Sequence, residues 1–116
     1  MSTSAVTTLT VVQTGDVTGT QTETDTNVAA SGQNQIVNLS SGANTITVPT
    51  GGTTPTSVII IPPSGNAVSI TFKGVTGDTG VRLHNTVFSR ISLDSSVTTF
   101  CLTAGSAITG VRLIYT

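Results

Sequence analysis

The amino-acid sequence predicts an all-β protein, with about eight to ten short antiparallel strands folded into a β-sandwich or barrel. Three observations lead to this prediction. β-branched residues dominate the chain and good helix formers are scarce. No stretch repeats its apolar residues with the period of a helix. Short apolar runs recur instead, and each is bounded by Gly, Pro, Asn or Ser.

Ten runs have the composition of strands. The predicted strands are Leu9–Gln13, Val17–Asp25, Gln35–Leu39, Thr45–Val48, Ser57–Ile61, Val68–Lys73, Gly80–Leu83, Arg90–Leu93, Thr98–Thr103 and Thr109–Tyr115. Turn-forming residues separate them, as in the run Pro62-Pro63-Ser64-Gly65-Asn66. A chain of 116 residues has the size of a single domain that can bury its own core.

The strands differ in how their apolar residues are placed. Val68, Ile70 and Phe72 alternate with polar residues, so we expect these three to face inward. The run Val58–Ile61 is apolar on both faces, which is typical of a central strand with a core on one side and a second contact on the other. Pro62-Pro63 ends this strand, because proline cannot donate to a ladder.

The first 27 residues differ from the rest of the chain. Threonine occurs there at every second position over the run Thr18, Thr20, Thr22, Thr24 and Thr26. A strand without an apolar side has weakly specified register and little reason to lie in a core. We therefore divide the chain into a polar, Thr-rich N-terminal arm, residues 1–27, and a β-sandwich domain, residues 28–116. The arm is either disordered or an extended segment that pairs with the sheet edge of a neighbouring subunit.

One internal repeat is clear. The segments Thr79–Leu83 and Thr109–Leu113 both read TGVRL. Alternation places Val and Leu on one face and Arg on the other, and the glycine before Val suits a turn exit or a β-bulge. We interpret the repeat as two similar strand starts, each with Val and Leu in the core and its arginine, Arg82 or Arg112, pointing outward. The alternative is an anion or ligand site shared by the two arginines.

The chain carries few charges. Charged residues make up 8% and the formal net charge is −1, which does not favour a nucleic-acid partner. The four cations all lie from residue 73 onward, at Lys73, Arg82, Arg90 and Arg112. A mean hydropathy of +0.29 with so little charge favours burial against other subunits, so we expect a homo-oligomer.

Neither a membrane segment nor a targeting segment is predicted. The longest apolar run, Val58–Pro63, is too short to span a bilayer. The start Met-Ser-Thr-Ser lacks a basic region followed by an apolar stretch, so we expect no signal peptide.

Residues able to perform chemistry are few. Cys101 is the only cysteine and lies in an apolar run, so we expect a small buried hydrophobe. His84 is the only histidine and has no second histidine with which to share a metal. Asp16 and Asp78 both follow Thr-Gly, a context in which aspartate forms turns, and calcium would need more clustered oxygen ligands. We expect no catalytic, cofactor-binding or metal-binding residues, no cofactor, and no enzymatic activity.

Aromatic residues make up 3% of the chain. Carbohydrate-binding β-sandwiches use exposed aromatic side chains to stack sugar rings. Here Phe72, Phe100 and Tyr115 lie in predicted strands that need core residues, which leaves Phe88. This scarcity argues against a carbohydrate-binding module, and receptor binding through loops stays open.

The C-terminal half resembles a known family. The run GVTGDTGVRLH at residues 74–84, followed by ISLDSSVTTFCLTAGSAITGVRLIYT at residues 91–116, resembles β-sandwich virion proteins of tailed bacteriophages. Small head-decoration, or cement, proteins and β-rich modules of tail and fibre proteins share this texture of strands and turns. The resemblance covers residues 68 to 116. It implies a jelly-roll-like fold, a trimer, docking on a capsid or baseplate, and an extended terminus used as an anchor.

We therefore expect a non-enzymatic bacteriophage virion structural protein, foremost a capsid decoration protein that docks as an oligomer and stabilises the shell. A trimer is favoured. The expected partners are copies of this chain and the major capsid protein or another virion protein, without nucleic acid or membrane. The expected location is the virion, after assembly in the cytoplasm of the bacterial host. The alternative is a tail, baseplate or fibre module that binds a host-surface glycan or protein.

Overall fold

The computed structural model describes residues 2–13, 19–30, 34–49 and 54–115, with side chains described from residue 34 onward. All regular elements of this described part are strands, and none is a helix, which confirms the all-β prediction. The strands are β1 (Ser2–Gln13), β2 (Gly19–Ala30), β3 (Asn34–Leu39), β4 (Gly42–Thr47), β5 (Ser57–Ile61), β6 (Ile70–Lys73), β7 (Val81–Arg82), β8 (Ser89–Ser92), β9 (Thr99–Ala104) and β10 (Ile108–Tyr115).

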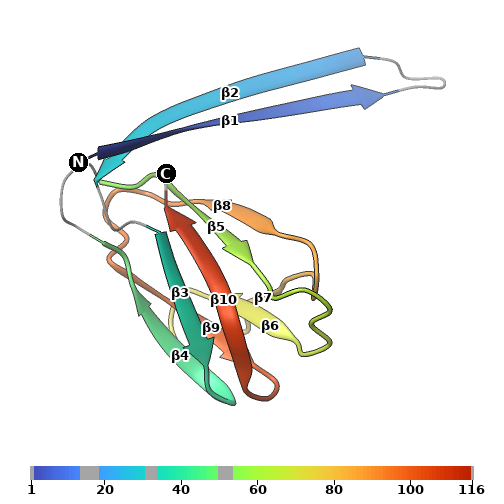
Figure 1. Cartoon of the computed structure of the whole chain (residues 1–116), viewed down its shortest axis with the longest axis vertical. Helices are drawn as coiled ribbons and strands as arrows, with labels where there is room; N and C mark the ends of the chain where they lie inside the picture. Colours follow the sequence, from blue (N-terminus) through green and yellow to red (C-terminus); the bar gives the residue numbers. More distant parts are fainter. Residues whose placement is uncertain (1, 14–18, 31–33, 50–53, 116) are drawn as a thin grey trace.

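Two antiparallel four-stranded sheets pack together, as in a β-sandwich (Figure 1). One sheet has the strand order β3-β10-β5-β8, and the other has the order β4-β9-β6-β7. Their facing sides share a single hydrophobic core. This arrangement of two packed antiparallel sheets confirms the predicted β-sandwich.

The strand pairs nest inside one another. β3 pairs with β10, β4 with β9, β5 with β8, and β6 with β7, so the chain from β3 to β10 is folded back on itself like a long hairpin. Two further pairings, β5 with β10 and β6 with β9, close the sheets. Each step along the chain from β3 onward crosses to the opposite sheet, except the step from β6 to β7.

The core follows from the alternation of apolar residues along the strands. In β10, Val111, Leu113 and Tyr115 are buried because every second side chain faces the other sheet. The buried apolar residues that join both sheets in one cluster are Leu39, Ile46, Val48, Val58, Ile60, Ile70, Leu93, Phe100, Leu102, Ala104, Ile108, Val111, Leu113 and Tyr115.

Two predictions about single strands are confirmed. Ile70 is fully buried, and Val68 and Phe72 pack against the core from partly buried positions, so all three face inward. β5 lies between β10 and β8 as an interior strand. Its Val58 and Ile60 enter the core, while the residues between them lie on the outer face.

The second TGVRL segment has the predicted structure. Val111 and Leu113 are fully buried and Arg112 is exposed. The pairing of β10 with β3 shifts register between Ile108 and Val111, which is the β-bulge expected at the glycine. Gly110 occupies that position with a φ of 86°, a conformation that glycine adopts without strain.

The first TGVRL segment does not have the predicted structure. Val81 is 65% exposed, so the prediction that it enters the core is wrong. β7 has only two residues and forms the edge of its sheet, so no further strand covers Val81. Leu83 is partly buried against the core, and Gly80 has a positive φ of 75° like its counterpart in the second segment.

The N-terminal residues form a separate two-stranded sheet, which we call the ribbon (β1 and β2). The two strands pair over their whole length, from Ser2 opposite Ala30 to Gln13 opposite Gly19. The predicted strand Leu9–Gln13 lies inside β1, and the predicted Val17–Asp25 overlaps β2, with residues 17 and 18 outside the described part. Use of this segment as an arm between subunits stays a prediction.

Candidate functional site

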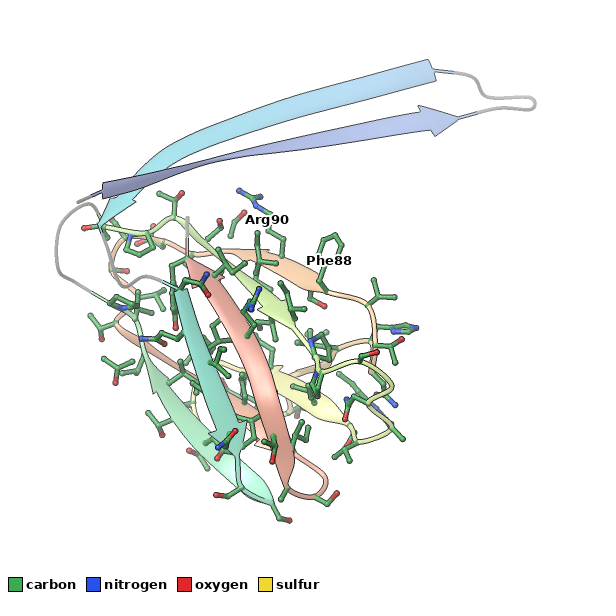
Figure 2. The ribbon with its side chains drawn as sticks, in the orientation of Figure 1. Phe88 and Arg90 are labelled. Carbon is green, nitrogen blue, oxygen red and sulfur yellow. The ribbon has the colours of Figure 1, made fainter. Side chains whose placement is uncertain are left out.

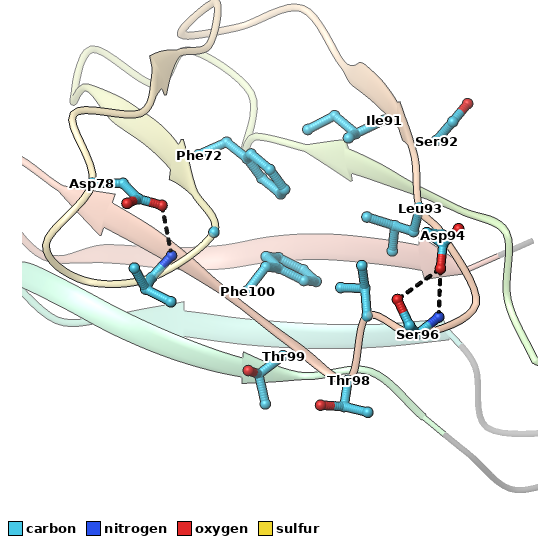
Figure 3. Close-up of a pocket in the computed structure, with 13 residues that line it drawn as sticks. Phe72, Asp78, Ile91, Ser92, Leu93, Asp94, Ser96, Thr98, Thr99 and Phe100 are labelled. Atoms are coloured by element: carbon cyan, nitrogen blue, oxygen red, sulfur yellow. Dashed lines mark hydrogen bonds between the residues drawn. The ribbon is translucent and has the colours of Figure 1, made fainter.

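A hollow of about 510 Å³ opens between the two sheets, where the β6–β7 and β8–β9 connections meet (Figure 3). Its wall combines two phenylalanines, two aspartates and several hydroxyl groups, so it can contact apolar and polar parts of one ligand. Its lining includes Phe72, Phe100, Asp78, Asp94, Ser96 and Thr98.

Two phenylalanines form the apolar part of the hollow. Phe72 of β6 and Phe100 of β9 stack with ring centroids 5.3 Å apart and an interplanar angle of 30°. The two strands are neighbours in one sheet, and alternation places both rings on the inner face. Phe100 is almost fully buried and Phe72 partly so, which means that the rings close the end of the core and also line the hollow.

Asp78 holds the loop on one side of these rings. Its Oδ2 accepts a hydrogen bond of 3.0 Å from the backbone N–H of Val75, and its own N–H donates to the carbonyl of Val75 at 3.1 Å. Two hydrogen bonds, one to the carboxylate and one between backbone groups, thus close the same short loop. The predicted role of Asp78 in a turn is confirmed.

Asp94 holds the turn on the other side of the rings (Figure 3). Its Oδ1 accepts hydrogen bonds from the Ser96 hydroxyl at 2.7 Å and from the Ser96 backbone N–H at 2.9 Å. The Ser96 side chain first, and the Ser96 backbone second, lower the pKa of Asp94 below its ordinary value. Asp94 is therefore a carboxylate at neutral pH and acts only as a hydrogen-bond acceptor.

Asp94 was not among the residues singled out from the sequence. The signal that could have found it is the run Asp94-Ser95-Ser96, because aspartate followed two residues later by serine is typical of a side-chain-stabilised turn. The same signal is weaker than the Thr-Gly-Asp context of Asp78, since no glycine accompanies it.

This arrangement offers polar and apolar contacts to a ligand. Both carboxylates are used to hold their loops, and Asp94 cannot supply a proton at neutral pH because its pKa is lowered. The stacked rings offer apolar contact, and Ser96 and Thr98 add hydroxyl groups on the wall. A small ligand that presents both hydroxyl groups and an apolar face fits such a wall.

His84 lies at a second hollow, of about 600 Å³, together with Asn66, Arg82 and Asn85. Its Nδ1 accepts hydrogen bonds from the backbone N–H groups of Thr86, at 3.1 Å, and of Val87, at 3.0 Å. Because both donors are backbone N–H groups, Nδ1 carries the lone pair and holds the turn. Asn66 fastens the neighbouring loop by donating to the carbonyl of Asn85 at 2.8 Å.

Of the other residues singled out in the sequence, Cys101 and Arg112 line neither of these two hollows. Cys101 is buried and unpaired by a disulfide, as predicted. Arg82 and Arg112 lie on different sheets, so the structure does not bring them together in a shared anion site. Asp16 lies outside the described residues.

The structure and the comparisons add three findings. Among the residues with described placement, no group of three or more His, Cys, Asp or Glu residues could hold a metal ion. In that same part of the chain, no helix has the length and apolar character needed to cross a membrane. No family model, no curated protein and no solved structure matches the chain.

Proposed function

We propose that the sandwich is a jelly roll. The support comes from the nested strand pairs and from the orders β3-β10-β5-β8 and β4-β9-β6-β7, in which the chain crosses between sheets at nearly every step. A jelly roll consists of eight strands in two Greek keys, and it recurs in viral capsid proteins and in lectins. Fold alone does not define function, so the surface must decide between these classes.

We propose that the protein is a non-enzymatic bacteriophage virion structural protein, and foremost a capsid decoration protein. The observation that carries this proposal is the set of exposed apolar side chains on the sandwich, in a chain whose C-terminal half resembles such proteins. The protein docks on the shell as an oligomer, with a trimer favoured, and its contacts with the major capsid protein form only in the assembled state. Binding of that kind stabilises the shell by mass action.

The exposed apolar residues of the sandwich support a role in assembly. Ile36 is 66% exposed and Phe88 is 62% exposed, and Val75, Val81 and Val87 are also largely accessible. Figure 2 shows Phe88 and Arg90 projecting on the same side of the molecule. Exposed apolar side chains on a chain with so few charges are suited to burial against a partner.

Sedimentation of capsid shells tests the proposal. Shells of the phage that carries the gene are assembled with and without the purified protein, and bound protein is quantified and located by cryo-electron microscopy. We expect saturable binding at fixed sites and a higher temperature of shell disruption. Absence of the protein from every shell preparation would refute the proposal.

The hollow beside Phe72 and Phe100 favours a second candidate, a tail, baseplate or fibre module that binds a host-surface glycan. Its stacked rings, fixed carboxylates and hydroxyl groups suit a sugar, which has both apolar and hydroxyl-bearing faces. A glycan array read with the purified protein tests this candidate, with Thr98→Val as a variant that changes one hydroxyl on the wall. Binding that the variant does not weaken would argue against the hollow as the glycan site.

A further inference from the structure

One outer sheet face combines isoleucines with arginine. The outward residues of the sheet β3-β10-β5-β8 lie in cross-strand rows, because residues paired in register share a face. One row joins Ile36, Arg112 and Ile61, and the next joins Ile114, Ile59 and Arg90. We call these residues the isoleucine face.

The isoleucine face is apolar and basic. Ile36 and Arg112 are exposed, while Ile59, Ile61 and Ile114 are half-buried. The aspartates of the sandwich that the structure describes, Asp78 and Asp94, lie in loops rather than in these rows, so the rows carry only positive charge.

The register of the ribbon sorts its residues into two unlike faces. On one face Thr20, Thr22, Thr24 and Thr26 pair with Val12, Thr10, Thr8 and Val6, so that face has no charge. On the other face Leu9 pairs with Glu23, and Thr7 pairs with Asp25. The only leucine of the ribbon therefore shares a face with both of its described carboxylates.

These two surfaces are complementary. The isoleucine face offers apolar side chains and the exposed Arg112, and Leu9, Glu23 and Asp25 occupy register positions on one face of the ribbon. The chain has no Lys or Arg before residue 73, so the ribbon has no cation to oppose Arg112. An isolated two-stranded hairpin is at best marginally stable in water, so the ribbon gains from a sheet to pack on.

We propose that the Glu23/Asp25 face of the ribbon of one copy packs on the isoleucine face of a second copy. This inference deepens the proposed function, because it names the contact that builds the oligomer. The contact joins two different surfaces, the ribbon of one copy and the isoleucine face of the next, so each single contact is heterologous. Such contacts close into a ring when the rotation between copies allows it.

The size of the contact favours an assembly in which every ribbon is seated on a sheet. Strands of twelve residues extend over roughly 40 Å, and a two-stranded ribbon is roughly 10 Å wide. The contact then buries at most about 400 Å² on each partner, or about 800 Å² in total, which is less than stable interfaces usually bury. When every ribbon is seated, each copy takes part in two such contacts, as it does in the favoured trimer.

Charge reversal in the full chain tests the contact. The mass of each species is measured by size-exclusion chromatography with light scattering, and folding is checked by circular dichroism. We expect an oligomer for the wild type, and Arg112→Glu is expected to weaken association by about tenfold or more, because like charges would then face each other. The double variant Glu23→Arg, Asp25→Arg should weaken association equally. The three changes combined should restore association, because the pairing of opposite charges is regained with reversed signs.

Arg82→Glu is the matched control, since Arg82 is an exposed arginine on the other sheet, and it should leave association unchanged. A wild-type chain that is a monomer at all accessible concentrations overturns the inference, because a ribbon seated on its own sheet would give that result. Reversed variants that stay associated, or a combined variant that does not recover, overturn it as well. An oligomer that binds no shell would refute the proposed function and leave this contact standing.

Discussion

Replacing Tyr115 by phenylalanine should stabilise the protein. Tyr115 lies in β10 opposite Val58 of β5, and its side chain is only 2% exposed. Its hydroxyl group is buried and has no hydrogen-bond partner among the described residues. A buried polar group without a partner costs about 1–3 kcal/mol, and Tyr115→Phe removes that group while it keeps the ring.

The expected gain is smaller than this cost, because deleting the oxygen also removes its packing contacts. We expect the free energy of unfolding to rise by about 1 kcal/mol, which corresponds to an increase in Tm of about 4 °C. Urea unfolding followed by circular dichroism at neutral pH measures the change, and the denaturant slope should stay constant. A variant less stable than the wild type would refute the reasoning, because it would show that the hydroxyl is hydrogen-bonded.

The pH dependence of stability supplies an independent check on the same group. Burial raises the pKa of Tyr115 to about 12 from its ordinary value of 10.0. The unfolded chain therefore releases this proton first, so the stability that Tyr115 contributes is full below pH 10 and is lost as the pH rises toward 12. The phenylalanine variant lacks this loss. Since Tyr115 is the only tyrosine, the ultraviolet absorbance of tyrosinate follows its titration directly.

Three further predictions concern stability. Phe100→Ala should lower the free energy of unfolding by about 3–5 kcal/mol in urea titrations, because it empties a buried site beside the Phe72 ring. A loss below about 1 kcal/mol would contradict the packing of Phe100 in the core. Gly80→Ala should lower the Tm more than Gly110→Ala in thermal melts. Both glycines have a positive φ, but only at Gly80 would the added carbon lie 2.5 Å from the carbonyl oxygen of Phe72. Equal losses of Tm would contradict this account. Asp94→Asn should weaken the β8–β9 turn and remove the stability that the Asp94 carboxylate contributes. In the wild type this contribution is full above the ordinary carboxyl pKa and is lost as the pH falls through the lowered pKa of Asp94. Parallel acid titrations of wild type and variant that coincide would show that the turn does not depend on the charge.

Much of the sandwich could be predicted from the sequence, because alternation along a strand reports burial directly. Val111 and Leu113 are buried where the pattern places them, and β5 is interior as its two apolar faces indicate. Val81 was misplaced because an identical pentapeptide occupies a two-residue edge strand, and pattern alone does not say which strands have neighbours. Neighbours are fixed by pairings between distant segments.

The candidate site was predicted less well than the sandwich. Phe72 and Phe100 were expected in the core, and their shared place at a hollow arises only when β6 and β9 pair. Asp78 was interpreted correctly because its signal is local, as a turn formed within four residues. The ribbon register, which separates its acidic face from its threonine face, needed the exact pairing of β1 with β2.

The nested pairing of the strands has a consequence for how the chain acquires its structure. β3 and β5 lie on either side of β10 and have no contact in register with each other, so their sheet stays open until β10 has been synthesised. The pair Ile36 and Arg112 shows how far apart in sequence the joined segments are. Domains dominated by such distant pairings fold slowly. We therefore expect this sandwich to form only after β10 has been made, and partly made chains to expose the apolar strands that the finished protein buries.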